Sequence, residues 1–222
     1  MRTVVISDIH GCYNELVNLM QDLVDSDKYD AKTDRLIFLG DYIDRGDDSK
    51  KVVQYIRDLQ KDNDNVIALK GNHEMMCVDY LREKGDNWLF NGCDNTIESY
   101  RGDKKQLIDD VEWMEQLPLY YEDEHFIYVH AGVDANKPLA EHSAYELLWV
   151  RESFIYSMDK FEKTVIFGHT PSISVMEGTK PYRTFADNVC IDTGCVFGGK
   201  LTALIIEDDN VKGFYQTEKI KN

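Results

Sequence analysis

The sequence has no long apolar run, and this absence limits where the protein can reside. Among its 222 residues there is no stretch of about 18 consecutive apolar residues, the length that a membrane-spanning helix requires. Residues 1–3 lead directly into Val4-Val5-Ile6, without the longer apolar segment and small-residue cleavage site of a signal peptide. We therefore expect a cytoplasmic protein that makes no membrane contact.

Positive charge is also scarce. The chain has 25 lysine and arginine residues against 41 aspartate and glutamate residues, and its formal net charge is −16. Proteins bind duplex nucleic acid through basic patches, and no basic run is present. This composition excludes duplex nucleic acid as a partner. An anionic substrate would need local positive charge, supplied by metal ions or by a few arginines.

The five cysteines show no paired spacing. Their number is odd and no CxxC pair occurs, so the sequence indicates neither a disulfide framework nor a zinc finger. We expect reduced thiols. With 43% hydrophobic and 30% charged residues the composition is that of a soluble globular protein, and the length fits one domain over residues 1–222.

The first third of the chain alternates two kinds of segment. Short apolar runs at 3–7, 35–39 and 65–69 are strand candidates, and residues 15–24 and 50–59 place apolar side chains at helical spacing. This order predicts an α/β protein with a largely parallel sheet. The strand candidates are nearly continuously apolar, which favours a sheet covered on both faces.

The segment from about Met75 to Glu124 breaks this pattern. It is polar and helical, and we interpret residues 75–124 as a helical cap inserted between core strands. Strand candidates then return, and the last two should form an antiparallel hairpin around Asp208-Asp209-Asn210, so the core should be mixed rather than all parallel. These later candidates are residues 126–129, 164–167, 189–191, 201–207 and 211–216.

Six of the strand candidates end in a loop that combines glycine with aspartate, asparagine or histidine. Four of the six histidines lie in these loops, which we expect to meet at one edge of one sheet, where α/β proteins bind ligands. Each loop alone could be an ordinary turn or helix cap, but together they favour a metal site. The loops contain Asp8-Ile9-His10-Gly11, Gly40-Asp41, Gly71-Asn72-His73-Glu74, His130-Ala131-Gly132, Gly168-His169-Thr170 and Asp192-Thr193-Gly194.

Side chains of these types suit Mn²⁺, Fe or Zn²⁺. Two ions ~3.5–4 Å apart, bridged by one carboxylate, lower the pKa of a bridging water and hold the attacking hydroxide in line with phosphorus. Asp41 is best placed to bridge, and Arg45 could bind phosphoryl oxygens. His73 could protonate the leaving alkoxide with Asp44 as its partner. The alternatives are a surface Asp44-Arg45 ion pair and a turn with a solvated His73 imidazole.

With these residues in place, the sequence resembles the phosphoprotein phosphatases of the calcineurin-like metallophosphoesterase superfamily, particularly the small bacterial and lambda-phage-type enzymes. Ser7 and Ala131 replace glycines of the family pattern. The resemblance implies a fold of mixed β-sheets packed as a sandwich and flanked by helices, with a small helical cap. The family pattern GDxHG, GDxxDRG, GNHE, HGG and GHT appears here, in order, as SDIHG, GDYIDRG, GNHE, HAG and GHT.

The resemblance also implies roles for individual residues. It makes His73 the general acid, supported by Asp44, and it makes Arg45 and Arg151 the phosphate-binding arginines. For Arg151 the alternative is a surface arginine of an amphipathic helix. The segment 88–100 resembles a cap feature of the bacterial subgroup, with helix packing as its alternative. The implied cofactors are two divalent metal ions per chain, Mn²⁺ first and Fe or Zn²⁺ as alternatives. The implied ligands are Asp8, His10 and Asp41 for the first ion, and Asp41, Asn72, His130 and His169 for the second.

The implied activity is hydrolysis of phosphomonoesters, with phosphoserine and phosphothreonine proteins as substrates. A dinucleoside polyphosphate hydrolase, acting on diadenosine tetraphosphate, is the alternative on the same fold. In symmetrically cleaving hydrolases we expect the second aspartate of GDxxDRG to be replaced, whereas Asp44 is present here. A non-catalytic metal-binding scaffold would be expected to have lost a ligand or the His73 and Asp44 pair. The sequence leaves the physiological substrate and the oligomeric state open.

Overall fold

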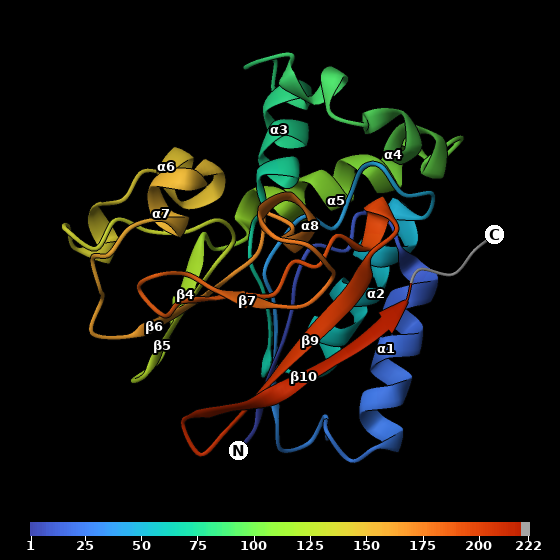
Figure 1. Ribbon diagram of the computed structural model, residues 1–222. Coiled ribbons are helices and arrows are strands. Elements are labelled where there is room, and N and C mark those ends of the chain that lie inside the picture. The colour runs from blue at the N-terminus through green and yellow to red at the C-terminus, as the bar shows by residue number, and fades with distance from the viewer. Residues whose placement is uncertain (219–222) are drawn as a thin grey trace.

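Two mixed sheets of five strands each form the centre of the computed structural model, which describes residues 1–218 (Figure 1). In the first sheet β1, β2 and β3 are parallel, and β9 runs antiparallel to both β1 and β10. The predicted mixed core and the final hairpin are thereby confirmed. The strand order is β10 (Asn210–Glu218), β9 (Lys200–Glu207), β1 (Thr3–Ile6), β2 (Arg35–Phe38) and β3 (Val66–Ala68).

The second sheet follows the same plan, with parallel strands in the middle and antiparallel strands at its edges. Strands β5, β6 and β8 are parallel, whereas β4 pairs antiparallel with β5 and β7 with β8. The edge strands β4 and β7 were not predicted, because they are only three and two residues long and carry no apolar run. The order is β4 (Tyr120–Glu122), β5 (Phe126–Val129), β6 (Thr164–Phe167), β8 (Val189–Cys190) and β7 (Tyr182–Arg183).

The sheets pack face to face, with helices on their outer faces. Alternate residues of one strand point to opposite sides, so Val5 packs between the sheets while Val4 packs under the helices α1 (Tyr13–Asp25) and α2 (Ser49–Asp62). Both faces of the central strand β1 are therefore covered, which explains its nearly continuous apolar run. The resulting α/β/β/α sandwich confirms the predicted fold class.

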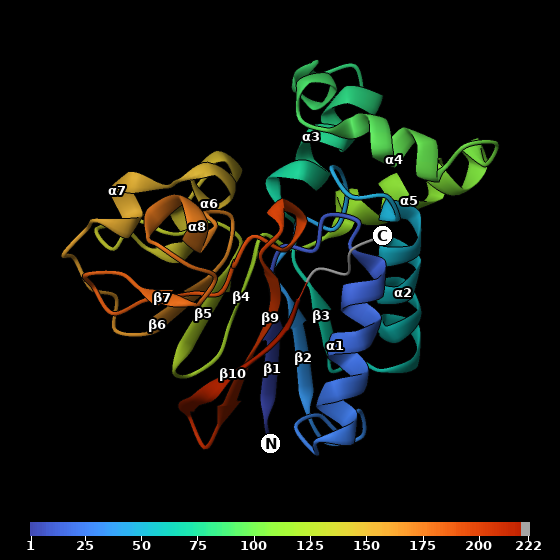
Figure 2. The ribbon, with the colours of Figure 1, turned by 45° about the vertical axis from the view of Figure 1, so that its right-hand side comes forward.

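On the far side, α6 (Ala144–Trp149) and α7 (Glu152–Ile155) cover the second sheet (Figure 2). Val129 and Phe167 of this sheet belong to the same buried cluster as Phe154 of α7. The remaining short helices are η2 (Leu139–Glu141), α8 (Ser172–Val175) and η3 (Cys195–Phe197). Among residues 1–218 no helix is both long and apolar enough to cross a membrane.

A group of helices lies above the carboxyl ends of β1, β2 and β3 (Figures 1 and 2). This group differs from the predicted limits of 75–124, because α3 already begins at Asn72 and α5 ends at Gln116. Residues 120–122 form β4 instead, since Pro118 follows the last helix and the next residues pair with β5. The group consists of α3 (Asn72–Leu81), η1 (Asn87–Phe90), α4 (Cys93–Ser99) and α5 (Lys104–Gln116).

Candidate metal centre

The predicted site residues come together where strands of both sheets end. They follow β1, β2 and β3 of the first sheet and β5 and β6 of the second. The expectation of one edge of one sheet was therefore wrong. Because the sheets stack with their parallel strands ending on the same side, the loops of both meet across the top of the sandwich. The six predicted ligands are all buried: Asp8, His10, Asp41, Asn72, His130 and His169.

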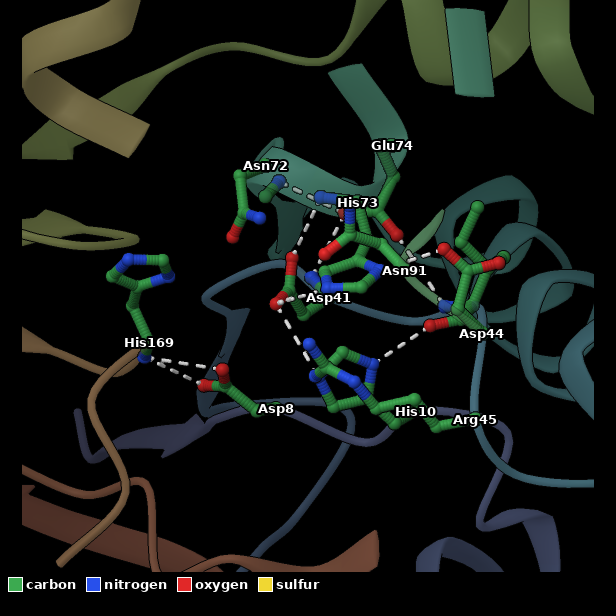
Figure 3. Close-up of polar contacts among 12 residues, drawn as sticks. Asp8, His10, Asp41, Asp44, Arg45, Asn72, His73, Glu74, Asn91 and His169 are labelled. Carbon is green, nitrogen blue, oxygen red and sulfur yellow. Dashed lines mark hydrogen bonds and ion pairs between the residues drawn. The ribbon is translucent and has the colours of Figure 1, made fainter. Parts of the chain in front are cut away.

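Asp41 lies between the imidazole of His10, which is labelled near it in Figure 3, and the imidazole of His130. Its Oδ2 is 3.4 Å from Nε2 of His10, and its Oδ1 is 3.4 Å from Nε2 of His130. The same nitrogen of His130 lies 2.9 Å from Oδ1 of Asn72 and 3.2 Å from Nδ1 of His169. Asp41 thus touches two separate groups of potential ligands, as a bridging carboxylate must.

The other nitrogens of two of these histidines are fixed by main-chain carbonyls. Nδ1 of His10 lies 2.8 Å from the carbonyl oxygen of Ile43, and Nδ1 of His130 lies 3.0 Å from that of Leu39. A carbonyl only accepts hydrogen bonds, so each Nδ1 carries the proton and each Nε2 keeps a lone pair free to bind a cation or accept a hydrogen bond. This is the arrangement that orients metal-ligating histidines.

The donor set fits divalent cations. Nε2 of His130 lies close to Oδ1 of Asn72 and Oδ1 of Asp41, and all three atoms carry lone pairs. These lone pairs repel one another, whereas a cation between them would attract all three. Burial and the neighbouring Asp8 raise the pKa of Asp41 well above its usual value, and bound positive charge would oppose both effects. Within residues 1–218, Nε2 of His169 is buried without a hydrogen-bond partner. Such an atom costs about 1–3 kcal/mol and indicates a place built for a bound group.

Asp8 is placed differently from the other expected ligands, and His73, the expected general acid, lies beside two of them. Both carboxylate oxygens of Asp8 accept a bond from the main-chain N–H of His169 at 3.1 Å, and Ser7 Oγ also donates to this carboxylate. The compact group around His10 and Asp41 is completed by His73, whose Nε2 lies 4.0 Å from Asp41 Oδ2. Asp8, His10 and His169 line a cavity beside this group.

The backbone at the site is strained. Among the described residues 1–218, ten non-glycine residues have positive φ, and five of these are predicted site residues. Each such residue costs roughly 1–3 kcal/mol, and such residues cluster at functional sites. The five are His10 (46°), Asp41 (56°), Asp44 (73°), Arg45 (68°) and His169 (66°).

Two glycines of the motifs are required because side chains of the site occupy the space that a Cβ would need. A Cβ on Gly71 would lie 2.2 Å from Oδ1 of Asp41, and a Cβ on Gly168 would lie 2.2 Å from Oδ2 of Asp8. Real Cβ atoms essentially never approach a heavy atom this closely. The glycines therefore let the main chain pass directly behind the carboxylates.

His73 and Asp44 form the expected pair, with Nδ1 of His73 2.6 Å from Oδ2 of Asp44. The helices above the sheet hold this carboxylate in place. Trp88 Nε1 donates to both of its oxygens at 3.0 Å, and Thr96 Oγ1 donates to Oδ1 at 2.7 Å. Burial raises the pKa of Asp44 to about 7, and burial together with the charge of Arg45 lowers that of His73 well below its usual value.

Replacing Trp88 by phenylalanine keeps an aromatic ring in the buried position but removes the donor to Asp44. We expect kcat toward a phosphothreonine peptide to fall by roughly 10–100-fold, the usual loss when an orienting partner is removed from a site. Trp113→Phe is the matched control. Nε1 of Trp113 donates a hydrogen bond of 3.0 Å to Gln60, and neither residue belongs to the site. A Trp88→Phe enzyme with the kcat of the control would show that this hydrogen bond does not support the pair.

Both predicted arginines line a cavity of about 330 Å³. Arg45 is held by the helices above the sheet, since its N–H donates to the carbonyl oxygen of Gly92 at 3.0 Å and Asn95 Nδ2 donates to its carbonyl oxygen at 2.7 Å. Its guanidinium donates to Nε2 of His10, so metal binding at His10 requires that guanidinium to move. Arg151 is exposed, yet its Nη1 donates to the carbonyl oxygen of His169 at 2.9 Å.

Three residues were given no role from the sequence. Ser7 supports Asp8, and the carboxylate of Glu74 accepts the N–H groups of Asp41 and Gly71 at 2.8 and 2.9 Å. Asp192 is buried and lines the cavity. Glu74 could have been found as the glutamate of GNHE, and Asp192 as the aspartate after the sixth strand candidate. Nothing in the sequence indicated that Ser7 does more than replace a glycine.

Comparison with known proteins places the chain in a family. It is 29% identical to "Serine/threonine-protein phosphatase 1" of Salmonella typhimurium, over 91% of each chain. It is also 29% identical to "Bis(5'-nucleosyl)-tetraphosphatase PrpE [asymmetrical]" of Oceanobacillus iheyensis, over 91% of this chain and 88% of that protein.

Among solved structures, a candidate diadenosine tetraphosphatase superposes with a TM-score of 0.73 at 19% identity, covering 100% of this chain and 95% of the other. The calcineurin-like phosphoesterase family model matches residues 1–212. With this match and the His and Asp clusters of the site, the chain belongs to the calcineurin-like phosphoesterases, a family of metal-dependent hydrolases.

Proposed function

We propose that this protein is a dinuclear metal-dependent Ser/Thr protein phosphatase. The observation that supports this choice is the buried pair of His73 and Asp44, 2.6 Å apart. A serine or threonine alkoxide is a strong base and leaves slowly unless it is protonated, so its hydrolysis requires a general acid. A polyphosphate leaving group is a much weaker base and needs such an acid far less.

The two divalent cations would be held by the six predicted ligands, with Asp41 shared between them, and Mn²⁺ is our first choice because the donors are imidazole, carboxylate and carboxamide groups without thiolate. When bound, these cations supply Lewis-acid charge and a nucleophile at neutral pH. We further propose that residues 1–222 form one cytoplasmic domain in which the helices within the predicted segment 75–124 act as a cap.

The chain's own residues complete the chemistry. Arg45 and Arg151 lie on the cavity wall and would donate to phosphoryl oxygens, which become more negative in the transition state. The proton would pass from Nε2 of His73 to the leaving oxygen. Burial disfavours the imidazolium, but a dianionic phosphoryl group in the cavity would favour it. Asp44 would hold the ring in position throughout.

The second candidate is hydrolysis of dinucleoside polyphosphates, because relatives bear that name and because the cavity has an apolar side on which a base could rest. That side is formed by Pro171, Ile173, Val196 and Phe197. The cavity volume of about 330 Å³ lies at the lower end of the ~300–1,000 Å³ range of ligand pockets, which suits a phosphorylated side chain better.

The test compares kcat/KM for a phosphothreonine peptide and for diadenosine tetraphosphate at equal Mn²⁺ concentration. We expect the peptide to be preferred by at least tenfold, with no turnover of either substrate after chelation. A large preference for the nucleotide would establish the second candidate. Loss of all metal-dependent turnover, with p-nitrophenyl phosphate as a third substrate, would contradict both.

A further inference from the structure

Two cysteines from distant parts of the sequence lie together beside a buried glutamate. Sγ of Cys12, a carboxylate oxygen of Glu15 and Sγ of Cys195 are all within 4.8 Å of one another, and the three residues are 5%, 5% and 2% exposed. Cys12 is the residue before α1, Glu15 lies in the first turn of that helix, and Cys195 opens η3.

We propose that Cys12, Glu15 and Cys195 form an additional metal site for a thiophilic divalent cation such as Zn²⁺. In tetrahedral zinc sites the bonds are ~2.3 Å to sulfur and ~2.0–2.2 Å to oxygen, which places neighbouring ligand atoms about 3.5–3.8 Å apart. Small side-chain rotations therefore suffice to bring these atoms onto one cation. Two sulfurs and one oxygen leave one tetrahedral position for water, as in zinc sites with an open position.

The position of Cys195 provides a route for the cation. Cys195 lines the same cavity as Asp8 and His10. The proposed thiol site therefore borders the cavity of the candidate metal centre. The two places differ in chemistry, because the predicted catalytic ligands offer only nitrogen and oxygen. Thiolates select zinc and cadmium, whereas manganese and magnesium prefer oxygen ligands. The thiol-containing site should therefore fill with a different ion.

Ordinary packing explains part of this cluster. Cys12 and Cys195 belong to the core under α1, and a carboxylate in the first turn of a helix interacts favourably with the helix N-terminus. A cation here would link the helix after the Asp8 and His10 loop to the turn that carries Phe197.

The test is a titration of the metal-free full-length protein with Cd²⁺, in the presence of a non-thiol reductant, followed by ultraviolet sulfur-to-cadmium charge-transfer absorption. We expect a saturable band with one equivalent bound through sulfur. The double variant Cys12→Ser/Cys195→Ser should lose the band, and Glu15→Gln should weaken cadmium binding roughly tenfold. The double variant Cys93→Ser/Cys190→Ser, which removes two buried thiols elsewhere, should retain the band.

Absence of the band in the unmodified protein, or its persistence in Cys12→Ser/Cys195→Ser, would overturn the proposal. Should the double variant fail to fold by circular dichroism, the single variant Cys195→Ser takes its place and must show the same loss. The absorption arises only from sulfur ligands. The band is therefore independent of the nitrogen and oxygen ligands of the candidate metal centre, whatever the phosphatase assays show.

Discussion

Replacing Asp41 by asparagine is expected to lower kcat/KM toward p-nitrophenyl phosphate by roughly 10³-fold or more at saturating Mn²⁺. The carboxylate stands between His10 and His130, 3.4 Å from each, and is the proposed shared ligand of both ions. Loss of this carboxylate weakens metal binding, and the metal charge stabilises the transition state by several kcal/mol. Every ~1.4 kcal/mol of lost stabilisation lowers the rate tenfold. Steady-state kinetics together with metal content by mass spectrometry would measure both effects.

The stability of the metal-free protein separates this effect from unfolding. Burial and the charge of Asp8 disfavour ionised Asp41, so Asp41→Asn should leave the Tm of the metal-free protein unchanged or raise it. Asp110→Asn is the matched control, because this buried carboxylate pairs with Arg57 outside the site and its loss should lower Tm but not kcat. An Asp41→Asn enzyme with near-normal metal-dependent turnover would refute the proposed bridging role.

Replacing His73 by asparagine should have an effect that depends on the leaving group. For a phosphothreonine peptide we expect kcat to fall by ~10²–10⁴-fold, the usual contribution of a general acid. For p-nitrophenyl phosphate the fall should be much smaller, because p-nitrophenolate is stable without a proton. Asp44→Asn should follow the same pattern, since Asp44 acts only through His73.

The control for this prediction is His125→Asn, which alters an exposed histidine that pairs with Asp209 at 3.4 Å. It should leave the kinetics on both substrates unchanged. Equal losses on the two substrates in His73→Asn would mean that His73 supports the metal group around Asp41, not proton transfer. The distinction is informative because Nε2 of His73 lies only 4.0 Å from that carboxylate.

The fold was largely predictable because its strands are marked by strong local signals. β1, β2 and β3 are buried on both faces and therefore continuously apolar, and two adjacent aspartates with positive φ, Asp208 and Asp209, make the turn of the final hairpin. The division into two sheets was not visible in the residues themselves, because the pairing partner of a strand leaves no local trace. The edge strands β4 and β7 are too short to show any period.

For the site, the residues that carry charge or imidazole at strand ends were identifiable, because glycine beside histidine or aspartate is recognisable in a loop. The residues that hold them were not. Trp88 and Thr96 lie in the segment 88–100, which the sequence marked only as resembling a cap feature, and their distance along the chain from Asp44 hides the contact. Ser7 acts on the residue next to it, but its role depends on a side-chain rotation that the sequence does not encode.

The pairing of β1 with β9 has a consequence for how the protein is made. Thr3 lies opposite Ile206, and the N–H of His169 binds Asp8. During synthesis on the ribosome, one edge of β1 therefore stays unpaired until nearly all of the polypeptide has emerged. Asp8 acquires its main-chain hydrogen bond only after residue 169 has emerged. Strand edges without hydrogen-bond partners promote aggregation, and contacts between residues far apart in the sequence slow folding. Nascent chains stalled before residue 200 are thus expected to depend on chaperones and to be inactive.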